Sequence, residues 1–264
     1  MIGADPGRPN VLLAYLGHSA FMLEASDHRI VIDPFLSGNP SAVIGAERVD
    51  TDVILVTHAH ADHLGDAIEI SRRTGARIVA TNEIAHHCRA QGATTIAAHL
   101  GGVLELAEAT VKLVPAWHSS SIGDEHITLG AACGFVVDMA GVSIYHAGDT
   151  ALFGDMELIG RYPDIAGGSD PSPAESLGGH RAPPKLDVAI LPIGGHFTMG
   201  IADAVIATKM LRARTVVPMH FGTFETIDVD PREFSSAVEV TTESSCKTLM
   251  PGDSAMLAPG KGAV

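Results

Sequence analysis

Short apolar runs separated by turn residues recur along this chain and predict a protein rich in β-strand. The runs are dominated by Val, Ile, Leu and Phe and end near Gly, Pro, Asn or Asp, a pattern typical of strands. Strands are expected at Val11–Leu16, Phe21–Glu24, Arg29–Ile32, Val53–Val56, Arg77–Ala80, Val103–Leu106, Val111–Ala116, Phe135–Asp138, Val142–Tyr145, Val188–Leu191 and Thr215–Val217. A closing hairpin of Thr248–Met250 and Ala255–Leu257 is expected around Gly252-Asp253.

Helical spacing of apolar positions follows several of these strands. One helix is expected after residue 63 with Gly75 as its stop, and another begins at Asn82 as N-cap and ends at Gly92. Further helices are expected at Gly154–Arg161, at Ile201–Arg212 and from Pro231, with Asp230 as cap. Strands in runs, separated by single helices and without a fixed repeat, favour sheet layers covered by helices in one domain, 1–264. Pro163–Pro184 lacks apolar periodicity and is expected to be an exposed loop.

Composition narrows the possible partners. The formal net charge is −14, so the surface should repel a phosphate backbone, and a nucleic acid is an unfavourable partner. No apolar run approaches the ~20 residues of a membrane span, and Met1–Asn10 does not resemble a signal peptide. The three cysteines are far apart and form no CxxC pair, which indicates a reduced compartment and a cytoplasmic protein. A small-molecule substrate is expected. The sequence leaves open whether the protein forms a homo-oligomer.

The densest cluster of potential metal ligands lies in Thr57–His63, directly after an apolar strand. It consists of His58, His60, Asp62 and His63. If the two leading histidines continue the extended backbone, they point to one side, while Asp62 and His63 sit where the chain turns. Two adjacent sets of ligands suggest two divalent ions, with imidazole and carboxylate favouring zinc and also serving manganese or iron. A polar surface turn rich in histidine is the alternative interpretation.

Three further candidates each stand just past the end of an apolar strand, namely His118, Asp149 and His220. Ligands at several strand ends can converge on one rim of a sheet stack. We expect His58, His60 and His118 to hold the first ion, Asp62, His63 and His220 to hold the second, and Asp149 to bridge them. Taken singly, His118 and His220 could equally be satisfied core histidines, and Asp149 an ordinary turn residue.

Catalytic roles are expected for Asp62, besides its place as a ligand, and for two further histidines. His18 and His196 lie near predicted strand ends and are candidates to donate a proton to the leaving group. The alternative for each is a hydrogen bond to a ligand or to a loop carbonyl. His146 is expected to support the ligands rather than to react, and Asp33 to orient a ligand histidine.

The sequence His58-Ala59-His60-Ala61-Asp62-His63 resembles the H-x-H-x-D-H motif of the metallo-β-lactamase superfamily. More narrowly, the chain looks like a bacterial and archaeal branch of metal-dependent hydrolases related to ascorbate-6-phosphate lactonase. The resemblance covers nearly the whole chain, including Tyr15–Phe21, Ile32–Leu36, His118–Ser121, Tyr145–Thr150, Leu191–Gly194 and Pro218–Phe224. It implies a four-layer αββα sandwich with the metals at one edge of the two sheets, and it supports the same seven ligands.

Two departures from that branch stand out. Pro163–Pro184 looks like an insertion, and Gly195-His196 stands where Asp-Asn would be expected before Phe197-Thr198-Met199-Gly200. The chain therefore lacks the acidic residue of that branch at position 195 and has an imidazole at position 196.

The expected function is hydrolysis of a small ester or lactone by hydroxide held at two metal ions, which also polarise the electrophile. A phosphodiesterase or nuclease is the main alternative, although neither a basic patch nor an added domain is visible. A non-catalytic metal-binding protein is a further alternative, but all seven ligand positions are filled. A di-iron oxidoreductase is disfavoured because that family typically carries Glu in place of His60.

Overall fold

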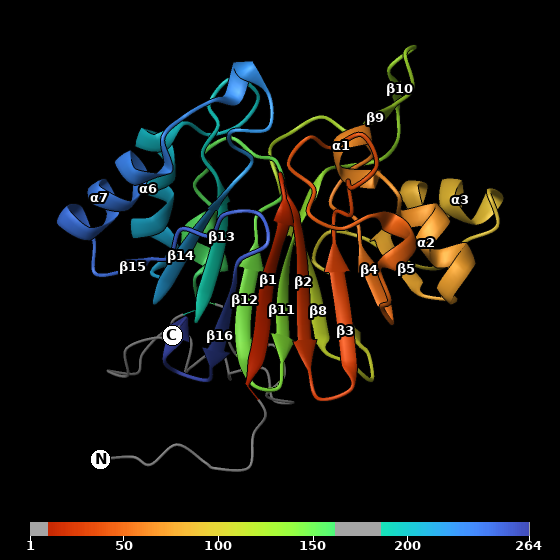
Figure 1. Ribbon diagram of the computed structural model, residues 1–264, viewed down its shortest axis with the longest axis horizontal. Coiled ribbons are helices and arrows are strands. Elements are labelled where there is room, and N and C mark those ends of the chain that lie inside the picture. The colour runs from red at the N-terminus through yellow and green to blue at the C-terminus, as the bar shows by residue number, and fades with distance from the viewer. Residues whose placement is uncertain (1–9, 162–185, 264) are drawn as a thin grey trace.

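The computed structural model describes residues 10–161 and 186–263, and its strands form two large sheets packed face to face (Figure 1). The eight-stranded sheet has the order β17 (Gly262–Ala263), β16 (Ser254–Ala258), β1 (Val11–Gly17), β2 (Ala20–Ala25), β3 (His28–Ile32), β4 (Val53–Leu55), β5 (Arg77–Thr81) and β6 (Thr94–Ala98). The seven-stranded sheet has the order β15 (Ser245–Cys246), β14 (Thr215–Met219), β13 (Val188–Pro192), β12 (Val142–His146), β11 (Cys133–Met139), β8 (Thr110–Pro115) and β7 (Val103–Glu105). A separate hairpin pairs β9 (Ser121–Ile122) with β10 (Ile127–Thr128).

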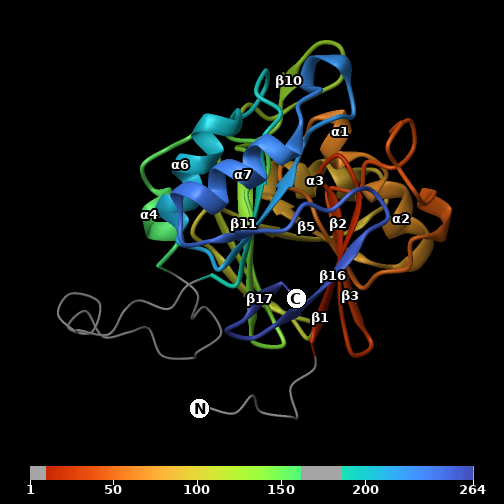
Figure 2. The same ribbon diagram turned by 60° about the vertical axis from the view of Figure 1, so that its left-hand side comes forward.

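Helices cover the outer face of each sheet, which completes four layers (Figures 1 and 2). Beside the first sheet lie α1 (Ala61–Leu64), α2 (Ala67–Thr74) and α3 (Asn82–Ala90). Beside the second lie α4 (Met156–Ile159), α6 (Ile201–Leu211) and α7 (Pro231–Thr241). The expected αββα sandwich is therefore confirmed.

Side chains that point alternately to the two faces of a strand show that the first sheet is buried on both faces. In β3, Ile30 and Ile32 belong to the core between the sheets, whereas Val31 packs with the helix-covered layer. In β4, Leu55 likewise belongs to the core between the sheets, and Ile54 packs with the helix-covered layer. Successive strand residues point to opposite faces, so a strand buried on both sides reads as a continuous apolar run.

The directions of the strands bring the turns that carry the candidate ligands to one edge of the sandwich. In the second sheet, β8 and β12 are both antiparallel to β11, and β12, β13 and β14 are parallel. In the first sheet, β3, β4 and β5 are parallel, and β1 runs the same way because it and β3 are both antiparallel to β2. All of these strands except β2 and β11 run in one direction within their sheet. Their carboxyl ends lie along one rim of the sandwich, at the top of Figure 1.

Several predicted elements differ from the structure. The expected hairpin is wrong in its first arm, because Thr248–Met250 is not a strand, and Ala255–Leu257 falls within β16, which pairs with β1 and β17. The helix expected after residue 63 is α2, which ends at Gly75 as predicted, but a separate short helix that was not predicted, α1, contains Asp62 and His63 of the histidine cluster. Gly65 separates them at φ 41°, and a Cβ there would lie 2.5 Å from the carbonyl oxygen of Pro34.

The helix ends expected at Asp230 and Gly75 agree with the structure, and Gly92, with φ 88°, directly follows Gln91, the C-cap residue of α3. Asp230 caps α7 by accepting a hydrogen bond from the backbone N–H of Arg232, and Gly75 ends α2 in the left-handed conformation. Asn82, expected as an N-cap, is instead the first residue of α3, and Thr81 stands at the cap position without a side-chain cap bond.

The predicted strands omitted β6, and the predicted insertion lies outside the described residues. β6 is only partly buried at the sheet edge, so its apolar signal is weak. Pro163–Pro184 belongs to the segment 162–185, and the expected single domain stays a prediction. In the described chain, every helix is too short or too polar to cross a bilayer.

Gly194 provides a direct test of how the second sheet supports the rim. A Cβ on Gly194 would lie 2.3 Å from the carbonyl oxygen of His220 and 3.0 Å from Cβ of Ile227. Because the first obstacle is backbone, Gly194→Ala should lower the free energy of unfolding by about 1–3 kcal/mol, as overpacking does. Urea unfolding of the metal-free protein measures this effect.

Gly154→Ala is the matched control, since a Cβ at Gly154 meets nothing within 4 Å. Its unfolding free energy should stay within about 0.5 kcal/mol of the parent value, as at an unconstrained surface site. Equal stability of the two variants would contradict the close packing of Gly194 against His220.

Candidate metal centre

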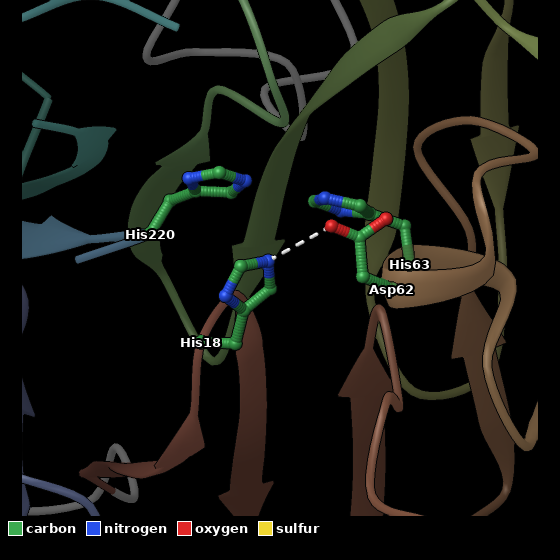
Figure 3. Close-up of side chains that lie close together, drawn as sticks. All are labelled: His18, Asp62, His63 and His220. Carbon is green, nitrogen blue, oxygen red and sulfur yellow. Dashed lines mark hydrogen bonds and ion pairs between the residues drawn. The ribbon is translucent and has the colours of Figure 1, made fainter. Parts of the chain in front are cut away.

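Two groups of ligand-type side chains lie side by side on the rim. The first consists of His58 and His60 from the turn after β4 and His118 from the loop after β8. The second contains Asp62, His63 and His220, which the sequence predicts together, and His18 from the turn between β1 and β2. Within each group the candidate ligand atoms all lie within 4.8 Å of one another, and Figure 3 shows the second group converging on one point.

Asp149 stands between the two groups, in the loop after β12. Its Oδ2 atom lies 3.7 Å from Nε2 of His118, 3.3 Å from Nε2 of His63 and 3.1 Å from Nε2 of His220. One carboxylate oxygen thus faces imidazole nitrogens of both groups. The structure brings all seven sequence-predicted ligand residues to one place.

Asp33 orients the histidines from below. Its carboxylate accepts hydrogen bonds from the backbone N–H of Thr57 at 2.8 Å, from Oγ1 of Thr57 at 2.6 Å and from Nδ1 of His63 at 2.8 Å. Because the Thr57 hydroxyl donates its only proton to Asp33, it must accept from Nδ1 of His58, 3.0 Å away. When the rings are neutral, Nε2 of both His58 and His63 is thereby left as the lone-pair nitrogen that faces the rim.

Burial and the charges of neighbouring side chains set the pKa values of His58, His63 and Asp149. Burial lowers the pKa of His58 well below its usual value. Burial acts against the charged form of His63 as well, but the carboxylates of Asp149 and Asp33 outweigh it and raise its pKa. For Asp149, burial would raise the pKa, and the neighbouring His63 and His220 instead hold it well below the ordinary range.

The donor set fits divalent cations. Nε2 of His63 and Oδ1 of Asp149 are buried and make no hydrogen bond, although charged partners lie nearby. Nε2 of His58 lies only 2.9 Å from Nδ1 of His60. Buried polar atoms without hydrogen bonds are costly unless another partner completes them, and imidazole with carboxylate is the donor chemistry that zinc, manganese and iron accept.

The backbone is strained at the same positions. His18, Asp33 and His220 adopt positive φ angles of 60°, 45° and 55°. Each such residue costs about 1–3 kcal/mol and persists only where its surroundings enforce it. At His18 the carbonyl oxygen accepts bonds from Oη of Tyr15 and from the backbone N–H of His220, both at 2.9 Å. The two sheets therefore hold each other's rim turns in place.

His18 is fully buried and held at both ring nitrogens. Nδ1 lies 3.0 Å from Oγ1 of Thr223, and Nε2 lies 3.2 Å from Oδ2 of Asp62. Burial is the main cause that lowers the pKa of His18 to about 4, so the ring is neutral at pH 7. This placement favours orienting Asp62 or adding a nitrogen to the second group, and the predicted proton-donor role stays a prediction.

Asp62 is half-buried at the second group. Burial would raise the pKa of Asp62, but the hydrogen bond with His18 and the charge of His63 lower it below the usual range. It is ionised at neutral pH and suited to bind a cation. Its predicted catalytic role stays a prediction.

His196 is not part of either group. It lies exposed in the loop after β13, with its ring 4.5 Å from that of Phe197. The loop itself borders the site, because the backbone N–H of Met199 donates to the carbonyl of Thr150, next to Asp149.

His196→Asn should therefore leave the metal content of the purified protein unchanged, with a modest loss of turnover if the imidazole handles the substrate. Elemental analysis and steady-state kinetics measure the two effects. The matched control is His86→Asn, which alters an exposed histidine of α3. A drop in metal content for His196→Asn alone would mean that the side chain is a ligand.

Two supporting residues, Thr223 and Ser120, carried too weak a sequence signal for a specific role. Thr223 contacts His18, and Ser120 accepts from the backbone N–H of Ala59 while donating to the carbonyl of Leu129. His146 donates from Nε2 to the carbonyl of Ser19 and accepts from the backbone N–H of Gly148, which ties the turn at His18 to the loop at Asp149. The supporting place expected for His146 agrees with these contacts.

Comparison with known proteins identifies the family. The sequence model of the β-lactamase superfamily domain matches residues 28–221. A UPF0173 metal-dependent hydrolase of Pelotomaculum thermopropionicum is 45% identical over 245 residues, covering 92% of this chain and 98% of the relative. One from Thermococcus kodakarensis is 47% identical over 230 residues, covering 86% of this chain and 92% of the relative.

Solved structures agree with this relationship. Igni18, a metallo hydrolase of the archaeon Ignicoccus hospitalis, superposes with a TM-score of 0.78 at 37% identity, covering 94% of this chain and 98% of that one. The predicted nearer relation to ascorbate-6-phosphate lactonase stays a prediction. The chain therefore belongs to the β-lactamase superfamily and, within it, to the UPF0173 family of metal-dependent hydrolases.

Proposed function

We propose that this protein hydrolyses a small ester or lactone at a centre of two divalent ions. The observation that carries the proposal is the position of Asp149, whose Oδ2 atom faces His118 of the first group and His63 and His220 of the second. One carboxylate between two sets of imidazoles is suited to holding two divalent ions close together, as in two-metal hydrolytic sites.

When bound, two such ions supply water of lowered pKa and polarise the carbonyl oxygen of the substrate. The residues of the chain hold and orient them: His58, His60 and His118 on one side, and Asp62, His63 and His220 on the other. Asp149 lies between the two sides, and its negative charge offsets part of the paired positive charge.

The residues beneath the site limit movement of the ligands. Asp33 holds His63 and, through Thr57, His58 in the tautomer that leaves Nε2 free. His18 holds Asp62 from the neighbouring turn. Oriented ligands lose less entropy on binding a cation, so this support favours tight binding.

Elemental analysis of protein purified without added metal, followed by assays on lactones, carboxylic esters and phosphodiesters, tests the proposal. Two ions per chain and activity on an ester or lactone are expected. One ion per chain, with full activity, would contradict the two-metal centre, and activity confined to phosphodiesters would contradict the substrate class. Zinc as native metal, a cytoplasmic location and a homo-oligomer stay predictions.

A further inference from the structure

The rim around the metal centre carries exposed apolar side chains. Among residues 10–161 and 186–263, the exposed aromatic side chains are Trp117, Phe197 and Phe224, with exposures of 69%, 58% and 41%. All three lie on loops that leave the rim ends of β8, β13 and β14. Ile127 of the β9–β10 hairpin is also exposed. Contiguous exposed apolar side chains are typical of binding surfaces, whereas apolar residues exposed singly are common, so the position of these four relative to the centre decides their meaning.

Each of these apolar residues is tied to a neighbour of the metal centre. The backbone N–H of Trp117, next to His118, donates to Oγ1 of Thr150, which follows Asp149. The ring of Phe224 lies 5.6 Å from that of His18 in an edge-to-face arrangement.

The other two are attached through their loops. Phe197 lies in the segment whose Met199 N–H donates to the carbonyl of Thr150. Ile127 lies in a hairpin that Ser120 joins to the backbone of Ala59, between His58 and His60. These contacts place Phe224 against His18 of the second group and place Trp117, Phe197 and Ile127 on loops that are bonded to the turns of the centre.

The same loops hold no fixed positive side chain. The segments 18–19, 33–45, 57–66, 116–132, 147–155, 193–200 and 220–230 contain neither Lys nor Arg. They do carry exposed acidic side chains, including Asp124, Glu125, Glu225 and Asp228. An anionic group of a substrate that extends beyond the ions would find no cationic partner in the described rim and would meet repulsion.

From these observations we infer that the substrate is uncharged away from its reacting carbonyl and carries an alkyl or aryl group that packs on Trp117, Phe224 and Phe197. This inference rests on the proposed ester or lactone hydrolysis and adds the chemical class of the remaining part of the substrate. It predicts discrimination against substrates with a distal phosphate or carboxylate.

A series of p-nitrophenyl esters with the metal-loaded protein tests the inference. From butanoate to octanoate, kcat/KM should rise about two- to fourfold for each added methylene, the upper value corresponding to full burial of that group. The monoadipate ester, with a carboxylate at its far end, should react at least about tenfold more slowly than the hexanoate. A flat series, or equal rates for these two esters, would overturn the inference.

Substitutions of the rim side chains test whether they cause the dependence of kcat/KM on the length of the acyl chain. Trp117→Ala and Phe224→Ala should each flatten the dependence of kcat/KM on chain length. Val240→Ala is the matched control, because it removes a comparably exposed apolar side chain from α7 and should leave the dependence unchanged. Loss of self-association in the aromatic variants, measured by analytical ultracentrifugation with an unchanged chain-length dependence, would assign the rim to a second copy and overturn the inference.

Binding without turnover separates this inference from the proposed function. Trp117 is the only tryptophan of the chain, so intrinsic fluorescence reports on this rim directly. Titration with 2-octanone should change the emission of the metal-loaded protein at lower concentration than titration with 7-oxooctanoate, and Phe224→Ala should weaken the ketone response. If this holds while no ester or lactone is hydrolysed, the proposed reaction fails and the apolar site stands. Equal responses to the two probes would overturn the apolar site, whatever the activity.

Discussion

Asp149→Ala is expected to abolish hydrolysis and to strip metal from the protein. The variant removes the one carboxylate whose Oδ2 atom faces imidazoles of both groups, at 3.1–3.7 Å from three Nε2 atoms. It also removes a negative charge from a site that must hold four positive charges when two divalent ions are bound. The loss should exceed the ~10–100-fold typical of removing a residue that merely supports a ligand. Elemental analysis and the assay of the most active ester or lactone measure both effects.

Asp155→Ala is the matched control for this variant. Asp155 lies exposed in the same loop, makes no side-chain cap bond to α4, and its removal changes the net charge equally. It should keep the metal content and activity of the parent. Full activity of Asp149→Ala would refute the two-metal assignment, and equal losses in both variants would point to charge alone.

Asp33→Ala is expected to weaken metal binding although Asp33 is itself not one of the proposed ligands. The variant leaves Nδ1 of His63 and both polar groups of Thr57 without their acceptor, in a fully buried place. Each buried donor without a partner costs about 1–3 kcal/mol, so the metal-free protein should lose several kcal/mol of unfolding free energy. Metal affinity should fall by about 10–100-fold, because the tautomers of His58 and His63 are no longer set.

Urea unfolding of the metal-free protein and competition with a chelator separate the two effects of Asp33→Ala. Asp27→Ala removes an exposed acidic residue from the turn between β2 and β3 and is the matched control. Unchanged metal affinity in an Asp33→Ala protein that remains folded would show that the histidines are oriented without this carboxylate.

The rim also bears on the alternative function of a nuclease or phosphodiesterase. A nuclease needs cationic side chains along the path of the phosphate backbone that it binds. The described rim loops hold no Lys or Arg and several exposed acidic side chains, consistent with the net charge of −14. The ester or lactone remains the better proposal.

The sequence alone was sufficient for the features that depend on neighbours in the chain. The motif from His58 to His63 is local, and so are the cap at Asp230 and the stop at Gly75. Apolar runs located nearly all long strands, because strands of these buried sheets show continuous hydrophobicity. Short or partly exposed elements such as β6 and the β9–β10 hairpin lacked that signal.

Contacts between distant segments were decided only by the tertiary structure. His18 joins Asp62 and His220 because β1 and β14 end at the same rim of two different sheets, which no spacing along the chain encodes. Asp33 sets the tautomer of His63 by a direct hydrogen bond and that of His58 through Thr57, and its place beside Thr57 depends on the pairing of β3 with β4. The exposure of Trp117, Phe197 and Phe224 is likewise a property of the assembled rim, since an aromatic residue reads as core in sequence until packing leaves it uncovered.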